Sequence, residues 1–333
     1  MAEQESLPLT LLTGFLGSGK TSLLKRALAD PAWSETAVLI NELGEIGLDH
    51  YLVDTVDGPV LELPGGCLCC AIREDLAASL RGLLERRAAG ALPPFRRIAI
   101  ETTGLADPAP ILFTLGADAF LDAHLHLDRV VTTVDAVTGE ATLARFAEAA
   151  RQVAIADRLV LTKTDLAPPA EALRGALAAL NPEAASDLAG AETGGAVLFG
   201  AIRANRMRPA PEPTGAHSHG IASFALILER PCSRLDFARA LGALARDRGE
   251  DLLRIKGIVG FSDRPERPAF VQGAQHALYP PVWLQAWPGG DRRSRLQFIV
   301  QGIALDEIVE RFACAAAVPV GAAHRTEEEI CST

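Results

Sequence analysis

Apolar and polar positions alternate in two different ways through the first 200 residues. Short apolar runs predict strands, and longer stretches with an apolar residue every three or four positions predict helices. The predicted strands are 8–13, 37–41, 59–63, 97–101, 129–134, 158–161 and 196–199, and the predicted helices are 22–29, 74–89, 143–156 and 170–180. This order predicts an α/β fold with a doubly wound, mostly parallel sheet, whose ligands bind beyond the carboxyl ends of the strands.

The pattern changes after a proline-rich stretch at 206–220, which has no apolar periodicity and is typical of a linker. We therefore expect a first domain at 1–205 and a smaller α+β domain at 221–317. A loosely ordered tail is expected at 318–333. The second domain is predicted from strands at 222–229, 252–261, 269–272, 282–286 and 295–300 and from helices at 234–248 and 305–315.

The composition indicates a globular protein and argues against some classes of partner. The 333 residues are 49% hydrophobic and 22% charged, which suits a globular protein with a large core, and the net charge is -10. An acidic chain is a poor match for nucleic acid or an anionic membrane, so neither is expected as a partner. The N-terminus lacks a secretory signal, and no apolar run approaches the ~20 residues of a membrane span. We expect a cytoplasmic protein.

A phosphate-binding loop is the clearest motif. Residues 14–21 (GFLGSGKT) match G-x-x-x-x-G-K-[ST] between a predicted strand and a predicted helix. Glycines let backbone N–H groups face phosphate oxygens, and the helix N-terminus adds positive charge. Lys20, one of only four lysines, is expected at the β- and γ-phosphates, and Thr21 at Mg²⁺. The nucleotide-binding residues expected here are Gly14, Gly17, Ser18, Gly19, Lys20, Thr21 and Ser22.

A second loop, TKTD at 162–165, follows a predicted strand and resembles the N-K-x-D signature with which GTPases bind guanine. Asp165 can accept hydrogen bonds from the guanine N1 and N2 groups, and the Lys163 stem can cover the purine. Thr162 replaces the usual asparagine, which predicts weaker selection of guanine. A strand end with a solvated Lys/Asp pair is the competing interpretation.

Two carboxylate-bearing segments are candidates for switch loops. Segment 41–49 carries Glu42 and Asp49 on a glycine-containing loop, where carboxylates can meet Mg²⁺, the attacking water or a second metal; a solvated acidic turn explains it equally well. Segment 98–104 ends a strand with Glu101, followed by Gly104. Glu101 is expected to position water or contact the Mg²⁺ shell, and Gly104 to sense the γ-phosphate. A simple strand cap is the alternative.

Three cysteines lie close together in a glycine-containing loop, at Cys67, Cys69 and Cys70. Thiolates suit Zn²⁺, Cu(I) or a similarly soft ion, and three ligands leave a fourth position open. A Cys67–Cys69 disulfide that acts as a redox switch is one alternative, and inert buried cysteines are another. Cys232, Cys314 and Cys331 are isolated in the sequence and are interpreted as packing or surface residues.

These motifs occur in the order seen in CobW-type GTPases: GFLGSGKT, NELGEIGLD, PGGCLCC, ETTGLADP and TKTD. LLRIKG at 252–257 and VQG at 271–273 resemble the C-terminal domain of that family. The resemblance covers about 7–316. It implies a GTPase metallochaperone that uses GTP and Mg²⁺ to load Zn²⁺ or Co²⁺ and delivers the metal to a client metalloprotein. By position, the metal ligands would be Cys67, Cys69 and Cys70 with Glu42 as a helper, Lys20 and Thr21 would serve the phosphates and Mg²⁺, and Glu101 the hydrolysis site. Together with Asp49 of segment 41–49, Lys20 and Glu101 are the catalytic candidates.

The resulting hypothesis is that GTP·Mg²⁺ closes the thiol loop around a metal and that hydrolysis loosens it. A homodimer that forms on nucleotide binding is a second partner to consider. A P-loop small-molecule kinase and a non-enzymatic nucleotide and metal sensor are the competing functions. No residue chooses among client proteins such as a cobalamin-pathway enzyme, a zinc enzyme or a nitrile hydratase.

Overall fold

The structure, a computed structural model, describes residues 6–41, 60–63, 69–189, 195–199, 218–288 and 292–320. The chain forms two compact units, the first made of 1–178 with 184–205 and the second of 179–183 with 206–333. Among the described residues, no helix combines the length and the apolar character that a bilayer span requires.

The N-terminal unit is built on a seven-stranded sheet in which every pair of neighbours is parallel. The strand order is β3-β2-β4-β1-β5-β6-β7, so the doubly wound α/β prediction is confirmed. The strands are β1 (Leu7–Gly14), β2 (Thr36–Asn41), β3 (Val60–Leu63), β4 (Arg97–Glu101), β5 (Leu125–Asp135), β6 (Arg158–Thr162) and β7 (Ala185–Leu188).

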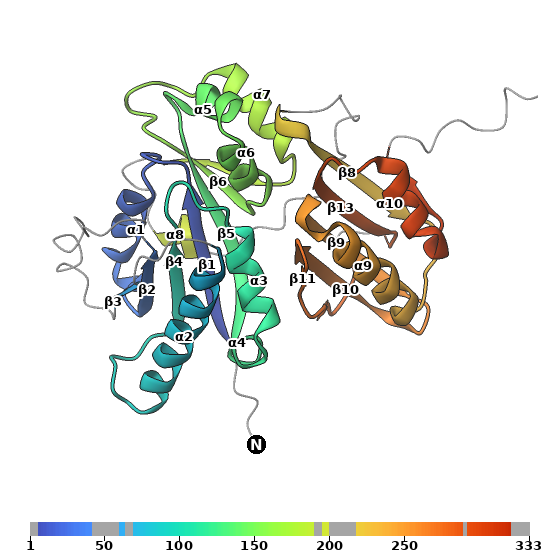
Figure 1. Ribbon diagram of the computed structural model, residues 1–333, viewed down its shortest axis with the longest axis horizontal. Helices are drawn as coiled ribbons and strands as arrows, with labels where there is room; N and C mark the ends of the chain where they lie inside the picture. The colour runs from blue at the N-terminus through green and yellow to red at the C-terminus, as the bar shows by residue number, and fades with distance from the viewer. Residues whose placement is uncertain are drawn as a thin grey trace, which may run out of the picture. The chain divides into compact units, whose positions relative to one another are not determined.

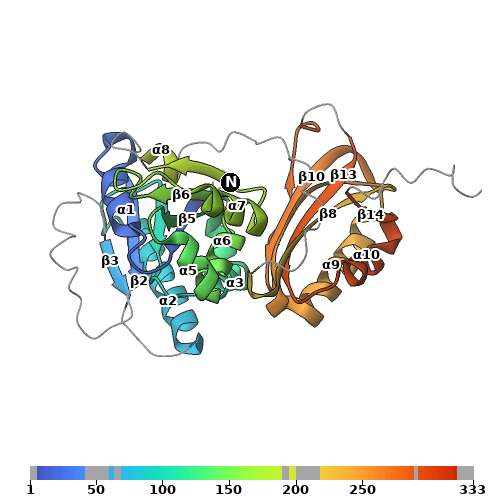
Figure 2. The ribbon, with the colours of Figure 1, turned by 90° about the horizontal axis from the view of Figure 1, so that it is seen from above.

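Helices cover both faces of this sheet. The helices α1 and α8 lie on one face, and α3 and α6 lie on the other (Figures 1 and 2). On the first face, Leu23 of α1 and Leu198 of α8 join Leu12 of β1 in one buried cluster. The helices are α1 (Lys20–Leu28), α2 (Cys69–Ala88), α3 (Ala109–Ala117), α4 (Ala119–His124), α5 (Gly139–Arg145), α6 (Ala147–Ala154), α7 (Glu171–Leu180) and α8 (Gly195–Phe199).

Two predicted elements differ in the structure. The strand predicted at 196–199 is wrong, because these residues form the short helix α8. The backbone of Gly195, its first residue, lies so close to the Trp33 ring that a Cβ there would overlap it. The helix predicted at 143–156 is two helices, α5 and α6, separated at Phe146. Phe146 has an extended backbone (φ -118°, ψ 118°), and its ring packs 4.6 Å from the ring of Phe15.

The C-terminal unit is an antiparallel sheet with two helices on one face, which matches the predicted α+β class (Figure 2). Phe237 and Phe312 from the helical layer pack with Phe298 of the sheet in one buried cluster. The strand order is β11-β10-β9-β13-β8-β14, with β12 paired to β10. The elements are β8 (Ile221–Leu228), α9 (Arg234–Arg248), β9 (Leu252–Phe261), β10 (Arg264–Ala274), β11 (Ala277–Leu278), β12 (Val282–Trp283), β13 (Ser294–Gln301), α10 (Leu305–Arg311) and β14 (Ala317–Pro319).

One expectation for this unit needs correction. Residues 318–320 are not loosely ordered, because β14 pairs with β8 (Ala317 opposite Leu228) and the Val320 N–H donates to the Ala225 carbonyl at 2.8 Å. Cys232 is buried in the core and Cys314 is exposed, so the interpretation of these two cysteines as packing or surface residues is confirmed.

Candidate nucleotide site

The turn from β1 into α1 has the backbone that a phosphate cradle needs. Gly14, Gly17 and Gly19 have φ values of 142°, 70° and 87°. Residues other than glycine adopt such positive φ values only at a cost in conformational energy. At Gly14 the need is steric as well, because a Cβ would lie 2.3 Å from the Thr133 hydroxyl oxygen. Gly19 caps the N-terminus of α1, where unpaired N–H groups favour an anion.

Lys20 is folded back onto its own loop. Its Nζ donates to the carbonyls of Gly14 at 2.9 Å and Phe15 at 3.3 Å, and the residue is only 8% exposed. Burial lowers the pKa of the Lys20 ammonium, and the negative charge of Glu101 acts in the opposite direction. The ammonium therefore lies within the loop, where a phosphate could take the place of the two carbonyl oxygens.

Hydroxyl groups hold the phosphate loop from behind. The hydroxyls of Ser18 and Thr133 are 2.6 Å apart, and the Thr162 hydroxyl donates to the Ser18 carbonyl at 2.7 Å. In a trans peptide the carbonyl and the next N–H point in opposite directions. Thr162 therefore fixes the direction of the Gly19 N–H as well as that of the Ser18 carbonyl.

Thr21 and Glu101 meet at the edge of the sheet. The Thr21 hydroxyl donates to Glu101 Oε1 at 2.6 Å, and Glu101 is 3% exposed at the end of β4, the strand next to β1. A hydroxyl and a carboxylate are oxygen ligands of the kind that Mg²⁺ prefers, so these residues fit a magnesium site. Ser22, the next residue of α1, has an exposed side chain.

The loop after β4 packs against the phosphate loop and is held by α6. A Cβ on Gly104 would lie 2.5 Å from the backbone nitrogen of Leu16, so the two backbones are in close contact. The Gln152 amide donates to the carbonyls of Gly104 at 3.2 Å and Ala106 at 3.0 Å. Gln152 is fully buried, and its Oε1 has no hydrogen-bond partner among the residues that the structure describes. Gln152 could not be predicted from the sequence, because a single glutamine inside a helix carries no signal of its contacts.

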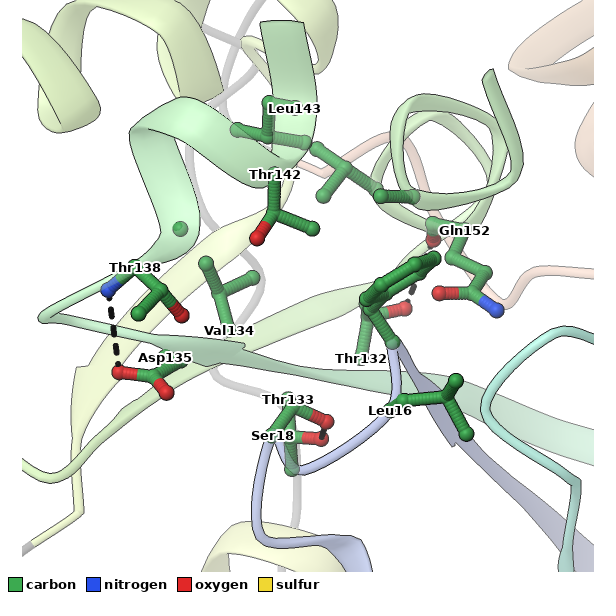
Figure 3. A pocket seen from close by; sticks show the side chains of 14 residues that line it. Leu16, Ser18, Thr132, Thr133, Val134, Asp135, Thr138, Thr142, Leu143 and Gln152 are labelled. Atoms are coloured by element: carbon green, nitrogen blue, oxygen red, sulfur yellow. Dashed lines mark hydrogen bonds between the residues drawn. The ribbon is translucent and has the colours of Figure 1, made fainter. Parts of the chain in front are cut away.

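A small cavity lies between the phosphate loop, β5 and the α5–α6 pair (Figure 3). Its lining includes Ser18, Thr133, Thr142 and Gln152. The volume is about 20 Å³, which is enough for a single water molecule and far too small for a nucleotide. The cavity is therefore a packing feature beneath the phosphate loop. A nucleotide would lie on the open side of that loop.

The TKTD loop is anchored to a neighbouring strand. Lys163 has a left-handed backbone (φ 56°), and its Nζ forms a 2.6 Å ion pair with Asp135 at the end of β5. Burial alone would raise the pKa of Asp135, but hydrogen bonds from Lys163 and from the N–H groups of Val137 and Thr138 bring it below its usual value. Asp165 is exposed. Sequence analysis missed Asp135, although a carboxylate at the end of a buried strand is a usable signal.

Several predicted site residues lie outside the described residues. Glu42, Asp49 and Cys67 are among these, and Cys69 and Cys70 are described only as the first residues of α2. Within the described part of the chain, no three His, Cys, Asp or Glu side chains come together as metal ligands. The predicted metal site therefore remains a prediction.

Family models match most of the chain. Residues 8–186 match the model of the CobW/HypB/UreG nucleotide-binding domain, and residues 221–316 match that of the cobalamin synthesis protein CobW C-terminal domain. This chain belongs to the CobW/HypB/UreG family. The phosphate loop, Glu101 and the TKTD loop thus lie within the family's nucleotide-binding domain.

Individual members of the family show similarity over nearly the whole chain. The zinc chaperone YjiA of Escherichia coli is 34% identical over 308 residues, which are 90% of this chain and 95% of YjiA. The crystal structure of Zn(II)-bound YjiA GTPase superposes with a TM-score of 0.69 at 28% identity, covering 93% of this chain and 99% of that chain. The zinc chaperone CobW of Sinorhizobium sp. is 27% identical over 95% of this chain and 99% of its own length.

Proposed function

We propose that this chain is a GTP-hydrolysing metallochaperone that loads Zn²⁺, or Co²⁺, through Cys67, Cys69 and Cys70 and delivers it to a client metalloprotein. One contact carries the proposal: the 2.6 Å hydrogen bond that brings Thr21 of the phosphate loop to the buried carboxylate of Glu101. The similar protein YjiA supports the choice of metal and of nucleotide, since it is named a zinc chaperone and a GTPase. Family membership argues against a small-molecule kinase.

Nucleotide binding uses groups that are already in place. As the phosphates enter the cradle, the Lys20 ammonium exchanges the Gly14 and Phe15 carbonyls for phosphate oxygens. The Thr21 hydroxyl oxygen would hold Mg²⁺, and the bound ion would neutralise charge on the phosphates. Glu101 is then left to accept a hydrogen bond from the attacking water and to orient it. Lys20 and Glu101 are thus the proposed catalytic residues, with Asp49 a further candidate on the 41–49 loop.

Guanine selection rests on Asp165 in this proposal. The hydroxyl of Thr162 is already engaged by the Ser18 carbonyl, so Thr162 supports the phosphate loop and does not face the base. Lys163 is held over the site by its ion pair with Asp135, which leaves its stem to cover the purine. The exposed carboxylate of Asp165 remains to accept the two guanine hydrogen bonds.

The strand register supports a short path from the phosphate site to the thiol loop. Leu63, at the end of β3, lies opposite Asn41 of β2, and Ile40 of β2 lies opposite Glu101 of β4. Two inter-strand spacings separate β3 from β4, which is about 10 Å. The thiol loop follows the end of β3, at the same edge of the sheet as Glu101. A structural change caused by loss of the γ-phosphate therefore needs to extend over only a short distance to affect the thiol loop.

A metal titration tests the coupling. Zn²⁺ affinity would be measured with a chromogenic chelator in the presence of Mg²⁺ and either a non-hydrolysable GTP analogue or GDP. We expect at least ~10-fold tighter binding with the GTP analogue, and a complete load-and-release switch requires ~10⁴-fold. Cys69→Ser should weaken Zn²⁺ binding and leave nucleotide binding intact, whereas Cys331→Ser should change neither. Equal Zn²⁺ affinities with the GTP analogue and with GDP would refute the proposed chaperone function.

The hydrolysis step needs its own measurement, because a sensor could show the same coupling. Phosphate release from GTP would be followed with Zn²⁺ present and absent, with ATP as the competing substrate. We expect slow hydrolysis of GTP that is lost in Glu101→Gln. Coupling without any turnover would favour a non-enzymatic nucleotide and metal sensor.

A further inference from the structure

Two cysteines that are far apart in the sequence are neighbours in the C-terminal unit. Cys232 lies in the connection between β8 and α9, and Cys314 lies in a 3-10 turn (Ala313–Ala315) after α10. The Arg230 N–H donates to the Ala315 carbonyl at 3.1 Å, continuing the antiparallel pairing of β8 with β14. The side chains of Cys232 and Cys314 are close enough for Cys314 to raise the pKa of the Cys232 thiol.

The two thiols differ in their exposure to solvent, and we therefore assign them different roles. Cys232 is 6% exposed and belongs to the buried cluster around Phe237 and Phe312, whereas Cys314 is exposed. Burial, and then the interaction with Cys314, raises the pKa of Cys232 to about 11. Cys314 is therefore the thiol that a reagent from solvent can reach, and Cys232 is a protonated thiol held directly behind it.

The backbone spacing suits a covalent link. Residues that face each other across antiparallel strands are ~4.5–5.5 Å apart at Cα, and a disulfide spans ~4.4–6.8 Å. The hydrogen bond from Arg230 to Ala315 continues the register of β8 with β14, so Cys232 and Cys314 lie within two residues of one close backbone contact, on neighbouring segments and not directly opposite each other.

We propose that Cys314 and Cys232 form an oxidisable thiol pair, which hydrogen peroxide or an organic hydroperoxide converts into an intramolecular disulfide. The Cys314 sulfur attacks a peroxide oxygen and the O–O bond breaks. Cys314 becomes a sulfenic acid, and the other oxygen leaves as water or as an alcohol. The Cys232 sulfur then attacks the Cys314 sulfur, the S–O bond breaks, and the hydroxyl leaves as water with the Cys232 proton. Two electrons pass from the two thiols to one peroxide.

The disulfide would join the end of β8 to the turn that leads into β14. Such a bond restricts the unfolded chain between the two cysteines, and so it raises the thermal stability of the oxidised protein. The site is separate from the Cys67, Cys69 and Cys70 loop, both in the sequence and in the domain that carries it.

Peptide mapping of the full chain tests the proposal. Trypsin places the relevant cysteines on separate peptides: Cys232 on 207–234, Cys314 on 312–325 and Cys331 on 326–333. The protein is treated with hydrogen peroxide, remaining thiols are alkylated, and digestion is carried out without reductant. We expect peptide 207–234 joined to peptide 312–325, with the loss of two hydrogens, together with a higher melting temperature.

Matched variants distinguish this pair from other thiols. Cys331→Ser should keep the cross-link and the shift in melting temperature. Cys314→Ser, at an exposed position, should lose both and leave Cys232 alkylated under denaturing conditions. The proposal is overturned if Cys314 is found joined to Cys331 or to a cysteine of the 67–70 loop. It is equally overturned if Cys232 and Cys314 are both recovered as alkylated thiols under conditions that oxidise that loop.

Discussion

Replacing Thr162 by valine removes the hydroxyl that fixes one peptide of the phosphate loop, with little change of shape. Thr162 is 4% exposed, and its hydroxyl donates to the Ser18 carbonyl at 2.7 Å. A buried acceptor that loses its donor costs ~1–3 kcal/mol. The Ser18–Gly19 peptide is then free to rotate, and nucleotide binding must order it again. We expect GTP and GDP to bind about tenfold more weakly, which corresponds to ~1.4 kcal/mol.

Calorimetric titration of both nucleotides measures this effect, and Thr36→Val is the matched control. Thr36 is fully buried, and its hydroxyl donates to the Trp33 carbonyl at 2.7 Å. It begins β2 at the amino edge of the sheet, the edge opposite the phosphate loop. The control should lose thermal stability and keep wild-type nucleotide affinity. Nucleotide affinity in Thr162→Val equal to that of the control would refute the argument that Thr162 orients the loop.

Three further outcomes are expected. Glu101→Gln should lower the rate of GTP hydrolysis by about 100-fold in single-turnover assays while GDP binding changes little, because it removes the charge near the attacking water and keeps the shape. Gly104→Ala should weaken GTP binding more than GDP binding in a displacement assay. Its Cβ would lie 2.5 Å from the Leu16 backbone nitrogen and would push the loop that is expected to sense the γ-phosphate, a group that GDP lacks. Asp135, whose pKa lies below its ordinary value of 3.8, stabilises the fold fully above that value and loses its contribution as pH falls through the folded pKa. The stability advantage of wild type over Asp135→Asn in urea titrations should therefore be constant near neutral pH and shrink below about pH 4.

The elements that follow a strong local pattern could be predicted from sequence. Helix α9 and strand β9 have the predicted bounds, because each combines a clear period with a long apolar face. The break between α5 and α6 could not be predicted, because it depends on Phe146 meeting Phe15 from a loop more than a hundred residues away. Helix α8 could not be predicted either, because a run of five apolar residues fits the period of a strand and that of a helix equally well.

The phosphate site was predictable to the extent that its residues act within one motif. Gly14 to Thr21 form a local structure that any strand-to-helix turn with this sequence would adopt. Glu101 followed from its position at a strand end. Asp135 and Gln152 act across the fold, on Lys163 and on the loop after β4, and only the three-dimensional structure brings these partners together.

The scarcity of lysine has a practical consequence for anyone who labels or immobilises this protein. Of the four lysines, Lys20 is enclosed in the phosphate loop, and Lys163 is paired with Asp135 beside the base position of the proposed site. Lys25 and Lys256 are half-buried, as Lys163 is, so an amine-reactive dye or sensor-chip ester has only three accessible lysines in the described chain, and one of them is Lys163. Protection of Lys163 by GDP against such a reagent would serve as a direct footprint of occupancy, and tethering through an added tag would spare the site.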